Sequence, residues 1–202
     1  MFWVRRSLCL LFIIIGVLGL SDAMVALSQK DPSQKVVAVL KIEGTIDQGL
    51  SPFVKRSLLE SASQKVNLIV LDITTPGGRL DSALEIRDAV LESPIPVVAF
   101  VNREALSAGA LISLAAHFVY MTPGALLGPA TPVTQDGSEA TEKVASAVRS
   151  AFKSSAEARG RDPLIAEAMV DESIEIEGLV EGGKLLTLTT EEALIHGYAD
   201  GQ

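Results

Sequence analysis

Ser107 is the side chain whose position in this sequence could serve nucleophilic chemistry. It lies in a turn of small residues, 106–110, between a strand-like apolar run at 96–101 and a helical pattern that continues to Ala115. A serine at the start of a helix commonly caps the free backbone amides there. The same amides, with the positive end of the helix dipole, would stabilise an oxyanion beside the serine. The turn by itself leaves both roles open.

A glycine pair, Gly77 and Gly78, follows the strand-like run at 66–73. Glycine can adopt positive φ and lets backbone amides approach a ligand closely. The pair could supply one donor of an oxyanion hole or part of a phosphate cradle, and an ordinary tight turn between a strand and a helix is the alternative. The GxxxxGK(S/T) pattern of a P-loop does not occur, which argues against nucleotide binding of that kind.

Lys143 is the candidate general base, because it shares one side of a long helical pattern with apolar residues. The pattern runs over 139–159, and Lys143 is in register with Ala147 and Ala151 at i, i+4 and i+8. Lys153 falls on the polar side of the same pattern. Burial disfavours the charged form of a lysine, which is the condition for a lysine to act as a base. The alternative is a lysine that covers apolar surface and keeps its ammonium group in water.

The two histidines do not offer a serine–histidine pair. His117 lies ten residues beyond Ser107, and the helical rise over that span is about 15 Å. His196 belongs to a C-terminal surface helix and follows no loop of the right kind. Because a catalytic triad needs hydrogen-bond reach, we expect structural roles for both histidines. A serine paired with a lysine is the nucleophile and base that the composition still permits.

The bulk composition excludes several other functions. With 202 residues, of which 48% are hydrophobic, the chain has material for one domain with a sizeable core. The formal net charge is -8 and no basic block is present, so we expect no nucleic-acid partner. One cysteine, Cys9, and two histidines cannot build a cysteine or histidine metal cluster, so we expect no metal site.

Residues 1–23 have the pattern of an export signal. Two arginines precede an uninterrupted apolar stretch at 8–20, and small residues at 21–23 suit a cleavage site. The stretch is short for a spanning helix, which needs about 20 apolar residues, and an uncleaved anchor is the alternative to a cleaved peptide. We expect a polar linker at 24–34 and one domain at 35–202, located in the periplasm or another extracytoplasmic space.

Strand-like and helical patterns alternate along 35–202, which predicts an α/β fold with a mainly parallel sheet flanked by helices. Ligand-binding loops in such folds lie beyond the carboxyl ends of the strands, where the glycine pair and the Ser107 turn both fall. We also expect a strand pair formed by 173–180 and 184–189. The expected strands are 36–42, 66–73, 96–101 and 117–121. Besides the helix that follows Ser107 and continues to Ala115, the expected helices are 52–62, 80–91, 139–159, 163–170 and 190–197.

Three ordered motifs carry a resemblance to a known family. They are DITTPGGR at 72–79, SAGA at 107–110 and MTPGALLGPA at 121–130. With the closing pattern at 189–200, they make the stretch 36–200 similar to the NfeD family. These are membrane-associated serine proteases of the ClpP/crotonase fold, encoded beside stomatin-like proteins. The resemblance implies repeated ββα units around a mainly parallel sheet. Family members usually continue into several transmembrane helices and a small β-barrel domain, which this sequence does not contain.

The resemblance also implies the roles of individual residues. Ser107 would be the nucleophile and Lys143 the base, with the amides of Gly78 and Ala108 forming the oxyanion hole. No cofactor is implied. A substrate strand would add to the sheet edge near the glycine pair, at Gly77, Arg79 and Leu80.

The leading hypothesis is an exported Ser–Lys endopeptidase that cleaves hydrophobic segments of membrane-associated proteins such as stomatin-like partners. We expect a homodimer or a larger homo-oligomer, because relatives with this fold oligomerise. A catalytically inactive membrane-partner or scaffold domain with the same fold is the alternative. A crotonase-like acyl-CoA enzyme would need a cytoplasmic supply of CoA, which the export signal argues against.

Overall fold

The structure is a computed structural model, and it describes residues 35–134, 137–138 and 140–202. The predicted export signal at 1–23 and the predicted linker at 24–34 therefore lie outside the described residues. Residues 36–202 form one unit by their own contacts. None of the helices in the described part of the chain combines the length and the apolar character that crossing a bilayer requires.

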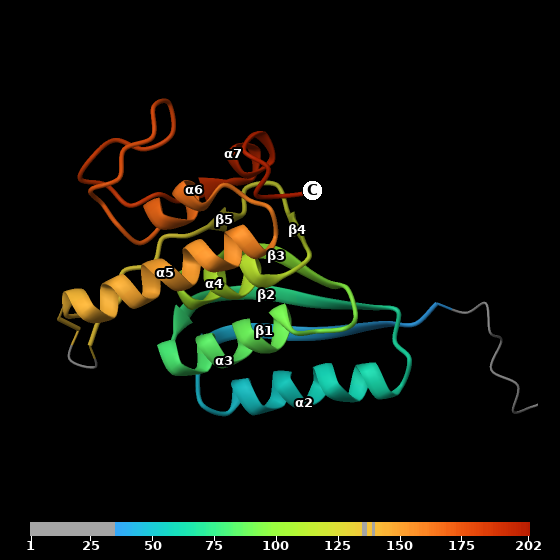
Figure 1. Ribbon diagram of the computed structural model, residues 1–202. Helices are drawn as coiled ribbons and strands as arrows, with labels where there is room; N and C mark the ends of the chain where they lie inside the picture. The colour runs from blue at the N-terminus through green and yellow to red at the C-terminus, as the bar shows by residue number, and fades with distance from the viewer. Residues whose placement is uncertain (1–34, 135–136, 139) are drawn as a thin grey trace, which may run out of the picture. The chain divides into compact units, whose positions relative to one another are not determined.

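A mainly parallel sheet forms the centre of this unit and confirms the predicted α/β class (Figure 1). Its strand order is β1-β2-β3-β5-β6, and β4 pairs with the first part of β3. The pairs among these strands are parallel except for that of β5 with β6. The strands are β1 (Val37–Ile46), β2 (Leu68–Gly78), β3 (Val97–Ala105), β4 (Phe118–Met121), β5 (Leu126–Leu127) and β6 (Leu188–Thr189).

Helices cover one face of the sheet. Because β1, β2 and β3 are neighbours in sequence order and such crossovers are right-handed, α2 and α3 lie on the same face. α4 packs against α3, against α5 and against β2 and β3, and all of its residues are buried. The helices are α2 (Leu50–Ser63), α3 (Leu80–Leu91), α4 (Ala108–Ala115), α5 (Glu142–Ala158), α6 (Pro163–Ala168) and α7 (Thr190–Ile195).

The opposite face, called the outer sheet face below, carries apolar side chains that remain exposed. The strand register places Val39, Val70, Val98 and Phe118 side by side across β1 to β4. Val39 is 61% exposed and Phe118 is 45% exposed. Parallel sheets usually have both faces covered, so an exposed apolar face is unusual for this class of fold.

Three strands continue beyond the ends predicted from composition. β1 runs to Ile46, β2 runs through Gly77 and Gly78, and β3 runs to Ala105, where the sequence predicted turns or loops. Glycines and polar residues disfavour strands locally, but here their backbones pair with a neighbouring strand. Ile46 pairs with Gly78, and Thr75 pairs with Ala105. Tertiary pairing therefore overrides local preference at the edge of the sheet that carries the site.

The predicted strand pair of 173–180 with 184–189 is wrong. Ile176 pairs with Val180 in an isolated bridge, and β6 pairs with β5 in antiparallel orientation instead. Leu188 is fully buried in the core. Burial of this side chain beside a strand distant in sequence decides the pairing over the local alternation of polar and apolar residues.

Candidate active site

Ser107 lies in a sharp turn between β3 and α4 and adopts an unusual backbone conformation. Its φ is 51° and its ψ is -115°, whereas positive φ is uncommon for residues other than glycine. Such a conformation costs on the order of 1–3 kcal/mol, and it persists only where the surrounding structure holds it. A strained serine between a strand and a helix exposes its Oγ, as in the nucleophile elbow of α/β-hydrolases. We call residues 105–109 the serine turn.

The Ser107 side chain does not cap α4. The residue occupies the N-cap position, but its hydroxyl makes no capping hydrogen bond, so the capping role considered from the sequence is wrong. A capping side chain normally reaches the helix amides from an extended backbone, and Ser107 is not extended. Its Oγ is therefore not occupied by the helix that it precedes.

Backbone hydrogen bonds to two other segments of the chain hold the serine turn in place. The Ser107 amide donates to the carbonyl of Pro129 at 2.8 Å, and the Leu106 amide donates to the carbonyl of Thr75 at 3.0 Å. Gly109 has no space for a side chain, because a Cβ there would lie 2.4 Å from Thr75 Cγ2. The strained serine is thus fixed between β2 and the segment that follows β5.

The glycine pair lies directly against Ser107. Gly77 has a φ of 111°, and a Cβ on it would lie 2.7 Å from Ser107 Cβ. A Cβ on Gly78 would lie 2.2 Å from the carbonyl oxygen of Ile46. β1, the glycine pair and Ser107 can approach one another this closely only because neither glycine carries a side chain.

Two backbone amides border the site as hydrogen-bond donors. Ala108 is the first residue of α4, so its amide has no acceptor within the helix. The Arg79 amide donates to Ile46 of β1 at 2.8 Å. Amides alternate in direction along a paired strand, so the Gly78 amide points away from β1. Gly78 and Ala108 line the same cleft as Ser107.

The cleft beside Ser107 has a volume of about 690 Å³. Its walls come from the start of α3, from α4, from residues 130–134 and from α5. Arg79 and Leu80 border it, whereas Gly77 lies against Ser107 and not on the cleft wall. The larger apolar side chains that line it are Leu80, Leu84, Leu111, Val133, Val144, Val148 and Phe152. Most of the cleft surface is therefore apolar.

An ion pair lies at the rim of the cleft. Arg79 Nε donates to Asp81 Oδ1 at 3.0 Å, and Arg79 Nη2 donates to Asp81 Oδ2 at 2.6 Å. The hydrogen bond from Arg79, followed by one from the Ser82 amide, lowers the pKa of Asp81 to about 2. The carboxylate therefore remains charged across the neutral range and holds the guanidinium beside the cleft.

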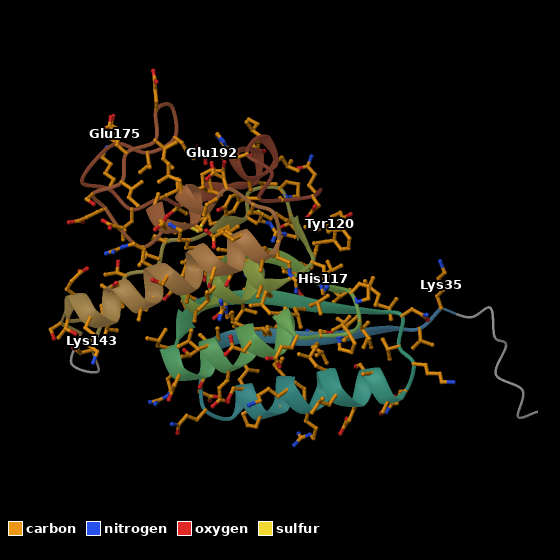
Figure 2. The ribbon with its side chains drawn as sticks, viewed as in Figure 1. Lys35, His117, Tyr120, Lys143, Glu175 and Glu192 are labelled. Atoms are coloured by element: carbon orange, nitrogen blue, oxygen red, sulfur yellow. The ribbon has the colours of Figure 1, made fainter. Side chains whose placement is uncertain are left out.

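Lys143 lies in the first turn of α5 and is exposed (Figure 2). Val144 and Val148 of the same helix line the cleft, but Lys143 does not, and no hydrogen bond joins its Nζ to Ser107 Oγ. Ala147 is exposed as well, so the predicted apolar edge is wrong for the first turns of α5. These turns extend beyond the helices on which α5 packs (Figure 1), and its buried residues begin at Val148.

Lys153, the second lysine of α5, has a partner. Its Nζ lies 3.2 Å from Glu167 Oε2 of α6, which agrees with its predicted place on the polar side of the helix. The predicted start of this helix at Glu139 lies outside the described residues, and α5 begins at Glu142. Of the two lysines, Lys153 is engaged in packing α5 on α6, and Lys143 is not.

The sequence matches the model of the NfeD1b N-terminal domain over residues 36–202. The chain belongs to the NfeD1b N-terminal domain family. It is 39% identical over 189 residues to membrane protein NfeD1b of Bacillus subtilis, covering 93% of this chain and 43% of that protein. It is 31% identical over 176 residues to membrane-bound protease PH1510 of Pyrococcus horikoshii, covering 83% of this chain and 37% of that protein. The chain thus spans about two fifths of the length of these curated relatives.

Solved structures resemble this NfeD1b-family domain. A serine-to-alanine variant of 1510-N, a membrane-bound stomatin-specific protease, gives a TM-score of 0.72 at 29% identity, covering 84% of this chain and 80% of that chain. A lysine-to-alanine variant of 1510-N in complex with a substrate peptide also gives a TM-score of 0.72 at 29% identity. That match covers 84% of this chain and 75% of that chain. ClpP1 from Listeria monocytogenes gives a TM-score of 0.61 at 21% identity, covering 81% of this chain and 89% of that chain. This likeness shows the fold alone. The predicted family and the ClpP-like fold are confirmed, and the domain is related to a membrane-bound protease.

The histidines of the NfeD1b-family domain occupy structural positions. His117 Nδ1 accepts a hydrogen bond from the Val97 amide at 3.1 Å, and burial, with the nearby charge of Arg159, lowers the pKa of His117. His196 is exposed at the end of α7. Neither histidine shares a hydrogen bond with Ser107. Within the described ranges, no three His, Cys, Asp or Glu side chains are grouped so that they could hold a metal ion.

Thr75 is a residue of this site that the motifs did not single out. It is fully buried, and its hydroxyl accepts a hydrogen bond from the Gly77 amide at 3.0 Å. A signal was present in the sequence, since polar Thr75 follows an apolar strand and stands two residues before the glycine pair. Its contacts, however, involve segments far apart in the chain, which spacing alone does not reveal.

Proposed function

We propose that this domain is a serine endopeptidase in which Ser107 Oγ is the nucleophile and Lys143 is the general base. The observation that carries the proposal is the strained serine turn, which lies against the glycine pair and borders an apolar cleft. The relationship to a membrane-bound protease supports the same class of reaction. Solved structures of that protease include a serine variant and a lysine variant, which fits a serine–lysine pair.

In the proposed reaction, the neutral amine of Lys143 accepts the proton of Ser107 as Oγ attacks a peptide carbonyl. The amides of Gly78 and Ala108 donate to the oxyanion that forms. The lysine then gives its proton to the leaving amine, and water hydrolyses the ester on Ser107 by the same steps. Since Lys143 is exposed, its use as a base requires the first turn of α5 to approach the serine when substrate fills the cleft.

The proposed substrates are extended hydrophobic segments of membrane-associated proteins, such as stomatin-like partners. The apolar lining of the cleft supports this class, because each apolar side chain removed from water there contributes to binding. Gly77, Arg79 and Leu80 are the positions proposed to bind the substrate strand. The predicted export signal supports a location on the extracytoplasmic side of a membrane, with the N-terminal segment as a peptide to be cleaved or as an anchor.

The proposal includes a homodimer or a larger homo-oligomer formed through the outer sheet face. Its support is the exposed apolar row on a mainly parallel sheet, where burial by a second copy would cover the face that helices leave open. Sedimentation should show an oligomer for the wild type and a monomer for Val39→Glu. The carboxylate of this variant would be buried in the interface without a partner. A wild-type chain that sediments as a monomer at all concentrations would contradict this arrangement.

A catalytically inactive scaffold domain is the second candidate function, and the exposure of Lys143 favours it. Incubation of the chain with hydrophobic peptides, followed by mass spectrometry, separates the two functions. The protease proposal predicts new peptide termini. In a parallel incubation with a fluorophosphonate, Ser107 Oγ should form an O–P bond with loss of fluoride, and the adduct should be absent in Ser107→Ala. A chain that binds the peptides and leaves them intact would favour the scaffold.

A further inference from the structure

Thr75 joins two backbone segments through one buried hydroxyl. The residue is 0% exposed. Its Oγ1 donates to the carbonyl of Gly44 in β1 and accepts from the Gly77 amide at 3.0 Å. A hydroxyl has a single proton and can also accept, so both of these bonds can exist together. The hydroxyl therefore connects β1 with the glycine pair.

The hydroxyl lies where the regular ladder of the sheet is interrupted. The register between β1 and β2 shifts between Glu43 and Thr45, so Gly44 has no partner residue in the ladder. The register between β2 and β3 shifts between Ile73 and Thr75. Bulges of this kind occur beside active sites, where they redirect the chain. Thr75 supplies through its side chain a bond that the interrupted ladder does not provide to Gly44.

The rest of Thr75 contacts the serine turn. Its carbonyl accepts a hydrogen bond from the Leu106 amide at 3.0 Å, and its Cγ2 lies 2.4 Å from the position that a Cβ on Gly109 would occupy. One residue therefore touches both sides of the site: the glycine pair through its hydroxyl, and the serine turn through its carbonyl and methyl group.

We propose that Thr75 is a positioning residue for the oxyanion hole. Its hydroxyl fixes the orientation of the Gly77 peptide, and thereby the direction of the next amide, that of Gly78, relative to Ser107. This inference rests on the proposed function, because only a developing oxyanion would make that direction matter for rate. Donors that are already oriented need no reorganisation during the reaction, so loss of the hydroxyl acts on the chemical step and not on substrate binding.

Thr75→Val tests the inference, because valine keeps the shape of threonine and removes the hydroxyl. Loss of one complete oxyanion donor lowers kcat by about 10²- to 10³-fold, and we expect a misdirected donor to lower it by about 10- to 100-fold with KM unchanged. Thr75→Ser keeps the hydroxyl and removes the methyl group, and it should recover most of kcat.

Thr190→Val is the matched control. Thr190 is also 0% exposed, and its hydroxyl donates to the carbonyl of Thr122 at 2.7 Å, away from the cleft. Both valine variants should lower Tm, but Thr190→Val should keep the wild-type kcat in the folded protein. In Thr75→Val the Gly77 amide should also exchange with solvent faster, as measured by NMR.

Two results would overturn the positioning role: Thr75→Val with wild-type kcat, or a fall in kcat of equal size in Thr190→Val. The Ser107→Ala variant, assayed beside them, keeps this outcome separate from the fate of the proposed function. If Ser107→Ala retains full activity, the proposed nucleophile is wrong and the role of Thr75 in an oxyanion hole falls with it. If Ser107→Ala is inactive and Thr75→Val is fully active, only the inference on Thr75 fails.

Discussion

The serine turn and the first turn of α5 carry the two proposed reacting side chains, and they differ in how firmly they are held. The backbone around Ser107 is bonded to Pro129 and to Thr75, and it is strained and closely packed. Lys143 is exposed, and among the described residues its ammonium group has no hydrogen-bond or ion-pair partner. One half of the proposed catalytic pair is thus preorganised, and the other is not.

This difference indicates where the rate of the proposed reaction is controlled. A strained nucleophile with two nearby amides requires no rearrangement before attack. Lys143 does not line the cleft, so the proposed proton transfer requires the first turn of α5 to approach Ser107. In the proposed reaction, the serine turn would therefore position the nucleophile, and the approach of α5 would limit the rate.

Replacement of Ser107 by alanine has the largest expected effect. Because the nucleophile itself is removed, we expect kcat for hydrophobic peptides to fall by at least about 10³-fold, with the remaining rate due to the cleft and the amides. Peptide cleavage followed by mass spectrometry measures it. Cleavage at the wild-type rate would show that the strained turn has no nucleophilic role.

Lys143→Ala should have the next largest effect, with Lys153→Ala as its matched control on the same helix. Loss of a general base lowers kcat by about 10²- to 10⁴-fold. Lys153 is partly exposed and paired with Glu167, so its loss should change the free energy of unfolding by about 0–1 kcal/mol and leave kcat intact. If Lys143→Ala keeps the wild-type kcat, as Lys153→Ala should, the exposed lysine has no part in the reaction. The contrast between a fixed serine and an unheld lysine would then have no catalytic meaning.

Gly78→Ala tests how closely the fixed half is packed. A Cβ at this position would lie 2.2 Å from the Ile46 carbonyl oxygen, so β1 and β2 must separate, and we expect a loss of about 1–3 kcal/mol in the free energy of unfolding. Peptide cleavage should fall as well, since the Gly78 amide moves.

Gly182→Ala is the control for that variant, because the nearest atom to a Cβ there is Glu175 Oε2 at 3.7 Å. Urea denaturation should show a change within about 0.5 kcal/mol for this exposed position. Similar destabilisation by the two alanines would mean that the glycine pair is not held as tightly as its distances indicate.

The smallest expected effect concerns His117, beyond the far end of α4. Its pKa lies below the ordinary value of 6.5, chiefly because burial disfavours the charged form. The unfolded chain therefore binds this proton more readily than the folded protein does. The contribution of His117 to the free energy of unfolding is thus highest above pH 6.5, where His117 is neutral in both states, and it falls as the pH drops below that value. Urea denaturation at pH 5.5 and 7.5 should show a smaller difference in His117→Asn than in the wild type. An unchanged difference would assign the pH dependence to other groups.

Much of the architecture could be predicted from the sequence, because it depends on local periodicity. The helix predicted at 80–91 is α3, with the same ends. The alternation of apolar strands and amphipathic helices identified the mainly parallel sheet, and the motifs identified the family. Ser107 and the glycine pair were recognised as candidates because loops of their composition follow strands in such folds. These features need only the order of residues along the chain.

The tertiary structure alone decided the properties that matter for chemistry. The positive φ of Ser107 arises because β2 and the segment after β5 hold its backbone. The exposure of Lys143 depends on where α5 extends past its neighbours, and the burial of Thr75 depends on an interrupted ladder between strands. Helical registry places a residue on one side of a helix, but only packing against other elements determines whether that side is covered. The sequence by itself thus determined most of the elements and the candidate nucleophile, and packing between distant segments decided strand pairing and which side chains are held in place.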